Sequence, residues 1–345
     1  MMRRRLLGTL RTANPPARAT LALTVAALAL GAAAAATAPA TAATTAKPAT
    51  AGVFAPYTDM SNSQESLLDT AITSHGVKNY TAAFVIGSGC NDIWGDTLPV
   101  GADSYTDPLI AKAKSEGANV IISSGGAAGE PLAWTCTDQA SINAGYQKIL
   151  DSYGVNSLDF DIEGAAIADT ASVARQMQAM KSIQDANPGF TFSVTLPVLP
   201  TGLTSDGVNI IQAAKTAGVK IGVVNIMAMD YYSGSPEMGQ AAISAAQATL
   251  AQMQAVDSSY TYANVGITPM IGTNDDGSTF TLADASTVES WAASNGIGRL
   301  SFWSINRDTS CSSSSGAAGI HPDASSTCSG VSQNQLAFSD AFAAF

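Results

Sequence analysis

From residue 52 onward the sequence alternates between two kinds of segment, and this alternation constrains the fold more than any other feature. Short runs rich in β-branched and aromatic residues end in Gly, Ser, Asp or Asn, and longer stretches with helical periodicity follow them. Several of the helix-like stretches end in Gly before the next apolar run, which is a common helix stop. The predicted strands cover residues 52–57, 81–87, 119–125, 155–163, 190–197, 221–230, 263–270 and 299–305.

Repeated strand–helix units over residues 52–345 predict an α/β fold, a (β/α)8 TIM barrel, whose usual length is about 250 residues. The alternative is an open doubly wound sheet, which would carry a Gly-rich phosphate-binding loop after the first strand. Residues 52–64 contain no such loop. In a barrel, the functional side chains gather at the carboxyl ends of the strands. The predicted helices cover residues 65–74, 108–117, 140–154, 170–186, 208–218, 239–256, 283–296 and 333–345.

The first part of the chain has a different composition from the rest. All five basic residues of the first 42 lie within positions 1–18, an Ala/Leu-rich run follows, and small-residue sites stand at 38–40 and 40–42. This order is typical of a secretory signal peptide. An uncleaved membrane anchor is the alternative, but weakly hydrophobic Ala dominates the run. We expect a signal peptide over 1–42 with cleavage near residues 40–43, a short flexible lead-in over 43–51, and a catalytic barrel domain over 52–345.

Charge excludes one class of partner. The 345 residues include 16 basic and 27 acidic residues, giving a net charge of −11. Removing residues 1–42 takes away five arginines and no acids, so the mature chain would carry 11 − 27 = −16. An acidic chain lacks the basic surface that neutralises phosphates. We therefore expect no nucleic-acid partner. Together with the expected signal peptide, this predicts a secreted, extracellular protein without a stable membrane partner, and we expect it to be a monomer.

Histidine, a common metal ligand, is scarce in this sequence. Only two histidines occur, His75 and His321, so neither a multi-histidine metal site nor a His-dependent catalytic triad is expected. Both histidines are predicted at the surface. The Asn-Asp-Asp-Gly sequence at 274–277 is a turn signal, with a calcium site as the alternative.

The four cysteines are expected to form disulfides, because disulfides persist outside the cytosol. Three pairings are possible. Cys311 and Cys328 bracket a Ser/Gly/Ala-rich stretch that needs tying down, so we predict that they pair with each other and leave Cys90 to pair with Cys136. Free thiols are the alternative, and the spacing fits no zinc site.

The strongest functional signal lies in the fourth predicted strand. Asp159, Asp161 and Glu163 alternate there with Leu, Phe and Ile. Because side chains alternate between faces along a strand, the carboxyl groups share the face that points into the barrel, with Glu163 at the top. Repulsion among buried like charges raises at least one pKa, as a general acid requires. A calcium loop would need polar, Gly-bearing spacers, and a solvated edge strand would not carry such bulky apolar neighbours, so we predict a catalytic role.

The segment SLDFDIEG at 157–164 resembles the D-x-x-D-x-D-x-E signature of glycoside hydrolase family 18, the chitinases and related endo-N-acetylglucosaminidases. The first Asp of that signature is Asn156 here. The stretch SSGG at 123–126 resembles the family's S-x-G-G, whose small residues let the backbone crowd the barrel centre. The stretch MAMDY at 227–231 is similar to the M-x-Y-D element, with Met229 in place of the usual Tyr.

Other stretches extend the resemblance over roughly residues 52–310. SFWSINRD on the eighth predicted strand resembles the segment that bears the Trp under the −1 sugar, which is Trp303 here. FAPYTDMS, TFSVTLPVLPTGLT and VGITPMIGTND are also similar to bacterial chitinases of this family.

The resemblance implies retaining hydrolysis of β-1,4-linked N-acetylglucosamine, in chitin or its oligosaccharides, by substrate assistance. Glu163 would protonate the leaving oxygen while the substrate's own acetamido oxygen attacks, forming an oxazolinium ion. Asp161 would orient the acetamido group, Asp159 would share a proton with Asp161, and Asp230 would hold the distorted sugar. No metal and no organic cofactor is needed.

Two alternatives share this fold. An endo-β-N-acetylglucosaminidase acting on N-glycan cores would use the same acid and differ in its groove loops. A non-catalytic lectin of the family typically lacks the acidic Glu, which is present here as Glu163.

Aromatic residues at or after the predicted strand ends suit a sugar groove, because sugar rings stack on aromatic faces; core packing is the alternative for each. Tyr231 or Tyr232 would take over the contact of the Tyr that Met229 replaces. The predicted substrate-binding residues are Trp303, Tyr57, Tyr231, Met229, Trp94 and Trp134.

Overall fold

The structure is a computed structural model of the chain. It describes residues 52–61, 65–95, 98–232, 237–311 and 324–345. The expected signal peptide, its cleavage site, the lead-in and His321 lie outside the described residues.

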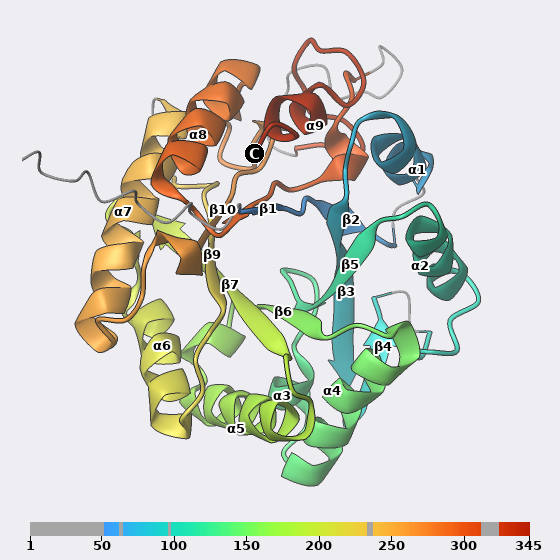
Figure 1. Cartoon of the computed structure of the whole chain (residues 1–345), viewed down its shortest axis with the longest axis vertical. Helices are drawn as coiled ribbons and strands as arrows, with labels where there is room; N and C mark the ends of the chain where they lie inside the picture. The colour runs from blue at the N-terminus through green and yellow to red at the C-terminus, as the bar shows by residue number, and fades with distance from the viewer. Residues whose placement is uncertain (1–51, 62–64, 96–97, 233–236, 312–323) are drawn as a thin grey trace, which may run out of the picture. The chain divides into compact units, whose positions relative to one another are not determined.

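The described strands form a closed parallel barrel, which confirms the predicted fold (Figure 1). The pairing order is β1-β13-β10-β9-β7-β6-β5-β3-β2, and every pairing along it is parallel. β1 and β2 are two halves of one strand, interrupted at Ala55 and Pro56; one half pairs with β13 and the other with β3, which closes the barrel. These strands are β1 (Val53–Phe54), β2 (Tyr57–Asp59), β3 (Asn79–Ser88), β5 (Asn119–Gly125), β6 (Ser157–Asp161), β7 (Thr191–Leu199), β9 (Val223–Met227), β10 (Val265–Thr268) and β13 (Arg299–Leu300).

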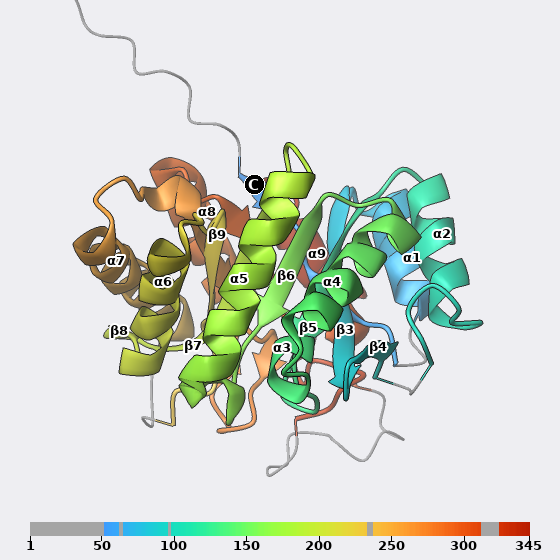
Figure 2. The same cartoon turned by 90° about the horizontal axis from the view of Figure 1, so that it is seen from below.

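Helices surround the barrel, and several of them end at signals in the sequence (Figures 1 and 2). α8 is capped at its start by Thr281, which forms a reciprocal capping box with Asp284, and at its end by Gly296 in the left-handed conformation. α1 and α5 have their predicted bounds. The helices are α1 (Glu65–Ser74), α2 (Thr106–Ser115), α3 (Leu132–Thr135), α4 (Gln139–Tyr153), α5 (Thr170–Ala186), α6 (Ser205–Ala217), α7 (Met238–Val256), α8 (Leu282–Asn295) and α9 (Ala337–Phe342).

Short antiparallel additions were not predicted. β4 (Asn91–Trp94) folds back on β3, and β8 (Gly202–Leu203) folds back on β7. A separate hairpin pairs β11 (Gly272–Thr273) with β12 (Thr279–Phe280), and the predicted turn at 274–277 connects its strands. Short 3-10 turns are η1 (Ala166–Ala168), η2 (Tyr262–Asn264) and η3 (Ile305–Arg307).

Two further predictions concern metals and membranes. Among the described residues, no group of three or more His, Cys, Asp or Glu side chains could hold a metal ion, so the calcium alternative at 274–277 finds no support. No helix in the described part of the chain has the length and apolar character to span a bilayer. His75 lies at the end of α1, partly exposed, and its Nδ1 is 2.7 Å from Oδ1 of Asp340.

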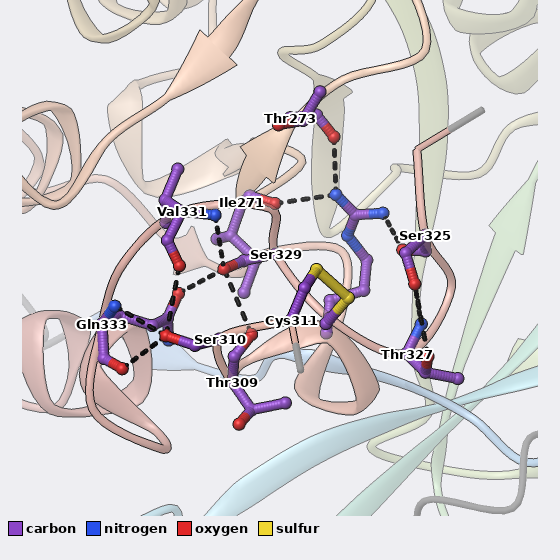
Figure 3. The surroundings of a disulfide bond; sticks show 12 residues. Ile271, Thr273, Thr309, Ser310, Cys311, Ser325, Thr327, Ser329, Val331 and Gln333 are labelled. Atoms are coloured by element: carbon purple, nitrogen blue, oxygen red, sulfur yellow. Dashed lines mark hydrogen bonds between the residues drawn. A yellow bond between two sulfur atoms is a disulfide. The ribbon is translucent and has the colours of Figure 1, made fainter. Parts of the chain in front are cut away.

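Both predicted disulfides are present. Cys90 and Cys136 have their Cα atoms 4.7 Å apart and tie the β3–β4 turn to the end of α3. Cys311 and Cys328 have their Cα atoms 5.0 Å apart and close the segment that precedes α9 (Figure 3). The pairing by elimination is therefore confirmed.

β4 buries a carboxyl group that has no partner. Asp92 is 4% exposed, and neither of its side-chain oxygens has a hydrogen-bond partner among the described residues. Gly145 of α4 makes room for it, since a Cβ there would lie 2.3 Å from Oδ2 of Asp92. Burial raises the pKa of Asp92 to about 7, and the nearby charge of Lys148 only partly opposes this.

The raised pKa predicts how stability depends on pH. Because the folded protein holds this proton more tightly than the unfolded chain, the contribution of Asp92 to stability falls as pH rises from about 4 to about 7. We expect Asp92→Asn to leave stability at pH 4 little changed and to increase it at pH 8, by at most about 4 kcal/mol. Urea unfolding at both pH values measures this. Asp151→Asn, at an exposed carboxyl on α4, is the control, and an equal response of the two variants to pH would contradict the prediction.

Candidate active site

β6 places two carboxyl groups inside the barrel and a third at its mouth. Asp159 is completely buried, Asp161 is 5% exposed, and Glu163 lies half-buried two residues beyond the strand end. Because β6 lies between β5 and β7, each inward carboxyl has a small or polar residue beside it on both neighbouring strands. The carboxyl groups of β6 therefore face the barrel interior, as the alternation in the sequence predicts.

The carboxylate of Asp159 is surrounded by hydrogen-bond donors. Arg299, at the start of β13, provides a cation whose Nη1 is 3.5 Å from Oδ1. The contacts around Asp159 direct donors at its carboxyl oxygens, and the proton that the family resemblance implies it shares with Asp161 stays a prediction. The hydroxyl donors are Tyr57 (2.8 Å), Ser123 (2.8 Å), Thr195 (3.0 Å) and Ser193.

Asp161 has the opposite environment. Its Oδ1 has no hydrogen-bond partner among the described residues. Burial raises the pKa of Asp161 well above its usual range, and the charges of Glu163 and Asp159 raise it further. The group therefore has a free acceptor position in a buried setting.

Glu163 also holds its proton more tightly than an ordinary glutamate. Burial is the main cause of its raised pKa, followed by the charges of Asp230 and Glu130. Burial also raises the pKa of Asp230, although backbone N–H groups of the loop at 275–276 favour its charged form. The spacing predicted a pKa raised by repulsion between like charges, whereas burial is the first cause of the raised pKa at Asp161, Glu163 and Asp230.

The two glycines after the third predicted strand let β5 and β6 approach each other closely. Gly125 and Gly126 have φ angles of 115° and 86°. A Cβ on Gly125 would lie 1.9 Å from the carbonyl oxygen of Asp161, and the N–H of Gly126 donates to that same oxygen (3.1 Å). The S-x-G-G segment thus fixes the backbone of Asp161.

A cleft of about 520 Å³ opens over these carboxyls. A smaller cavity of about 210 Å³ adjoins it, and Trp303, Phe84 and Ala127 contribute to both. The rings of Trp303 and Phe84 stack with centroids 5.6 Å apart. The residues around the main cleft include Asp161, Glu163, Asp230, Trp303, Tyr57, Met227, Met229, Tyr232, Thr195, Leu199 and Asp275.

Most of the predicted site residues therefore meet in one place. Trp303, Tyr57 and Met229 line the cleft together with three of the four predicted catalytic carboxyls, and Asp159 lies beneath it. Of the two tyrosines suggested as substitutes for the usual Tyr, Tyr232 lines the cleft and is 76% exposed.

Three predicted aromatic residues do not line the main cleft. Tyr231 packs into the core, because the chain turns sharply at Asp230 and Tyr232, which both have positive φ. Trp94 is a buried hairpin residue that borders only the smaller cavity, and its Nε1 donates to Tyr153 Oη (2.7 Å). Trp134, in α3, packs partly buried against the core and lines neither cavity.

Sequence reasoning also missed residues that shape the site. Arg299 compensates Asp159, Phe84 stacks on Trp303, and Asp275 reaches the cleft from the β11–β12 hairpin. The only sequence signal for Arg299 was a charged residue at the start of a predicted strand that is otherwise uncharged.

Known proteins show similarity to most of this chain. A protein of Escherichia coli K12 named probable bifunctional chitinase/lysozyme is 34% identical over 318 residues, which cover 85% of this chain and 34% of that protein. Endochitinase 11 of Metarhizium anisopliae is 35% identical over 275 residues, covering 74% of this chain and 52% of that protein. The chain thus spans about a third to a half of these curated relatives. No protein-family model matches it.

Solved structures match the fold. The catalytic domain of a hyperthermophilic chitinase from Pyrococcus furiosus is 33% identical, with a TM-score of 0.74, over 84% of this chain and 93% of that one. A family 18 chitinase from Pseudoalteromonas aurantia has a TM-score of 0.54 at 15% identity, which shows the fold alone.

A parallel barrel with grouped carboxyls in a cleft at its strand ends is the arrangement of a barrel glycosidase. The chain belongs to glycoside hydrolase family 18.

The Asp159–Arg299 pair predicts a large stability effect. Asp159→Asn keeps the side-chain volume but leaves a buried guanidinium without its counter-charge, so we expect a loss of about 3 kcal/mol at pH 7. Ser123→Ala, which removes one neutral donor to the same carboxylate, should cost about 1 kcal/mol. Urea unfolding measures both, and equal losses would contradict the assigned ion pair.

Proposed function

We propose that the chain is a secreted chitinase that hydrolyses β-1,4-linked N-acetylglucosamine polymers with retention, by substrate assistance. The observation that carries this proposal is the order of the carboxyls along β6: Glu163 lines the cleft, and beneath it lies a buried Asp161 whose Oδ1 has no hydrogen-bond partner among the described residues. The names of the relatives, chitinase and endochitinase, support the substrate class.

Glu163 is the general acid in this proposal. Its raised pKa keeps it protonated closer to neutral pH than an ordinary glutamate, so that it can donate to the leaving glycosidic oxygen. After the bond breaks, the same carboxylate takes a proton from the incoming water.

Asp161 acts on the substrate's acetamido group. Its free Oδ1 is suited to accept the amide N–H, which turns the acetamido oxygen toward the anomeric carbon. That oxygen forms the new C–O bond as the glycosidic bond breaks, giving an oxazolinium ion whose positive charge the Asp161 side chain stabilises. Water then opens the ion, and two inversions restore the original anomeric configuration.

The remaining residues hold the sugar. Trp303 provides an aromatic floor, Met229 lines the wall where the family usually has Tyr, and Asp230 faces the same space. Asp159, which contacts Arg299, lies beneath Asp161 and supports it. The signal-peptide-like composition of residues 1–42 and the two disulfides support secretion. Monomeric state and the absence of nucleic-acid or membrane partners stay predictions.

Glu163→Gln tests the assigned acid. The amide cannot donate an acidic proton, so kcat on a chitooligosaccharide should fall by at least about 10³-fold while the substrate Kd stays within about threefold. Glu289→Gln on α8, away from the cleft, is the matched control and should be fully active. Near wild-type turnover by Glu163→Gln, or an inverted anomer in the first products of the wild type by NMR, would contradict the mechanism.

The substrate is tested by comparing products from colloidal chitin and from a high-mannose glycoprotein. We expect N-acetylglucosamine oligosaccharides from chitin and no released glycan, measured by mass spectrometry. Glycan release without chitin hydrolysis would assign the chain as an endo-β-N-acetylglucosaminidase instead.

A further inference from the structure

Asp230 has a backbone conformation that few residues other than glycine adopt. Its φ is 48°, and Tyr232 two residues later has a φ of 51°. For residues with a Cβ this left-handed region is unfavourable, and it persists where the surroundings hold it. Asp230 comes only a few residues after β9 ends at Met227, so the strand ladder does not hold it. The conformation therefore depends on contacts from elsewhere in the chain.

Those contacts come from the turn between β11 and β12. The N–H of Asp230 donates to Oδ1 of Asn274 (3.3 Å), and the N–H of Asp276 donates to Oδ1 of Asp230 (3.2 Å). The N–H of Tyr232 also donates to the Asp276 carboxylate (2.9 Å). One side of the turn thus binds the backbone of Asp230 and the other side binds its carboxyl group, so the turn sets the direction of that carboxyl.

Asn274 is the buried centre of this turn. It is 0% exposed, and its Nδ2 donates to the carbonyls of Met270 (2.9 Å) and Gly272 (3.0 Å). With Oδ1 accepting from Asp230, both kinds of group on the amide have partners. An aspartate of the same shape would be an acceptor only when ionised and would leave both carbonyls without their donor. The position thus requires an amide.

The β11–β12 hairpin is also held by a buried arginine, Arg307. Nη2 of Arg307 donates to the carbonyls of Ile271 (3.0 Å) and Thr273 (2.6 Å), and Nη1 donates to the carbonyl of Ser325 (Figure 3). These bonds join β11 to η3, which lies a few residues after β13, the last strand of the barrel. The turn therefore has a support that does not involve the cleft.

The segment closed by the Cys311–Cys328 disulfide provides a second support. The N–H of Thr273 donates to the carbonyl of Ser329 (2.7 Å), the residue after Cys328. Gly272 has a φ of 75°, and a Cβ there would lie 1.9 Å from the same Ser329 carbonyl oxygen. β11 is thus pressed against this segment, and Asn274 is held in place without a substrate.

We propose that Asn274 is a positioning residue, which fixes the left-handed backbone of Asp230 and so directs its carboxyl into the cleft. The effect on catalysis rests on the proposed function, since Asp230 would hold the N-acetylated sugar. The effect on the conformation of Asp230 does not rest on it.

Kinetics of Asn274→Ala test the catalytic part. We expect kcat on a chitooligosaccharide to fall about 10- to 100-fold with KM changed less than about threefold, because the carboxyl is misdirected while the cleft remains. In an Asp230→Ala background, Asn274→Ala should have less than about a twofold further effect, since it acts through Asp230. Independent, multiplying losses would overturn the proposal.

The matched control is Asn264→Ala. Asn264 also joins separate backbone segments, with Nδ2 donating to the Gly222 carbonyl (3.0 Å) and Oδ1 accepting from the N–H of Thr261 (3.2 Å), but it precedes β10 at the other end of the barrel. It should lose stability and keep its kcat. If Asn274→Ala does not fold, Asn274→Asp serves instead: kcat should fall at neutral pH and recover partly in acid, where the protonated carboxyl can donate. If Asn274→Asp kept the wild-type kcat at neutral pH, the proposal would be overturned.

Hydrogen–deuterium exchange of residues 228–232 tests the conformation without any substrate. We expect at least about tenfold faster exchange in the Asn274 variant that folds and unchanged exchange in Asn264→Ala. Unchanged exchange in both would overturn the proposal whatever the enzyme hydrolyses. Faster exchange in a protein whose wild type does not hydrolyse chitin would instead contradict the proposed function and leave the positioning role standing.

Discussion

The ion pair between Arg299 and Asp159 determines how this barrel tolerates carboxyl groups in its interior. Two carboxyls stacked on one face of β6 cannot both be ionised cheaply without compensation. Asp159 receives the cation and the hydroxyl donors, whereas Oδ1 of Asp161 receives neither. Burial is the main cause of the raised pKa of Asp161, followed by the charge of Glu163 and then that of Asp159. The site thus depends on an asymmetry between two neighbouring residues of one strand.

The contacts that close the barrel also build this asymmetry. Tyr57 begins the second half of the split first strand, and its hydroxyl reaches both Asp159 and Thr195 (2.8 Å each). Arg299 lies on the strand that pairs with the first half. A barrel that failed to close would lose a hydrogen-bond donor and the counter-ion of Asp159 together. Fold stability and site chemistry are therefore coupled through the same buried side chains.

The sequence predicts those parts of the molecule that depend on local periodicity. The alternation in β6 gave both the strand and the face of its carboxyls, because that pattern has a period of two residues and needs no partner. The role of Arg299 could not be predicted from the sequence, because its partner Asp159 lies 140 residues away. Trp94 was misplaced because its strand folds back as a hairpin, and Tyr231 because two positive φ angles redirect the chain.

The difference between local patterns and contacts of distant residues also explains why Asp161 and Asp230, two acids of one site, are held in different ways. Asp161 ends a strand whose neighbours on both sides pair with it in register, so the sheet itself orients its side chain. Asp230 lies beyond the end of β9, where no ladder continues, and a residue there can point into the cleft only if another segment holds it. The β11–β12 turn does this, fastened in turn by Arg307 and the disulfide-closed segment. The motif of one strand therefore identifies the acid at the cleft. The direction of the Asp230 carboxyl depends instead on several segments that no local sequence pattern connects.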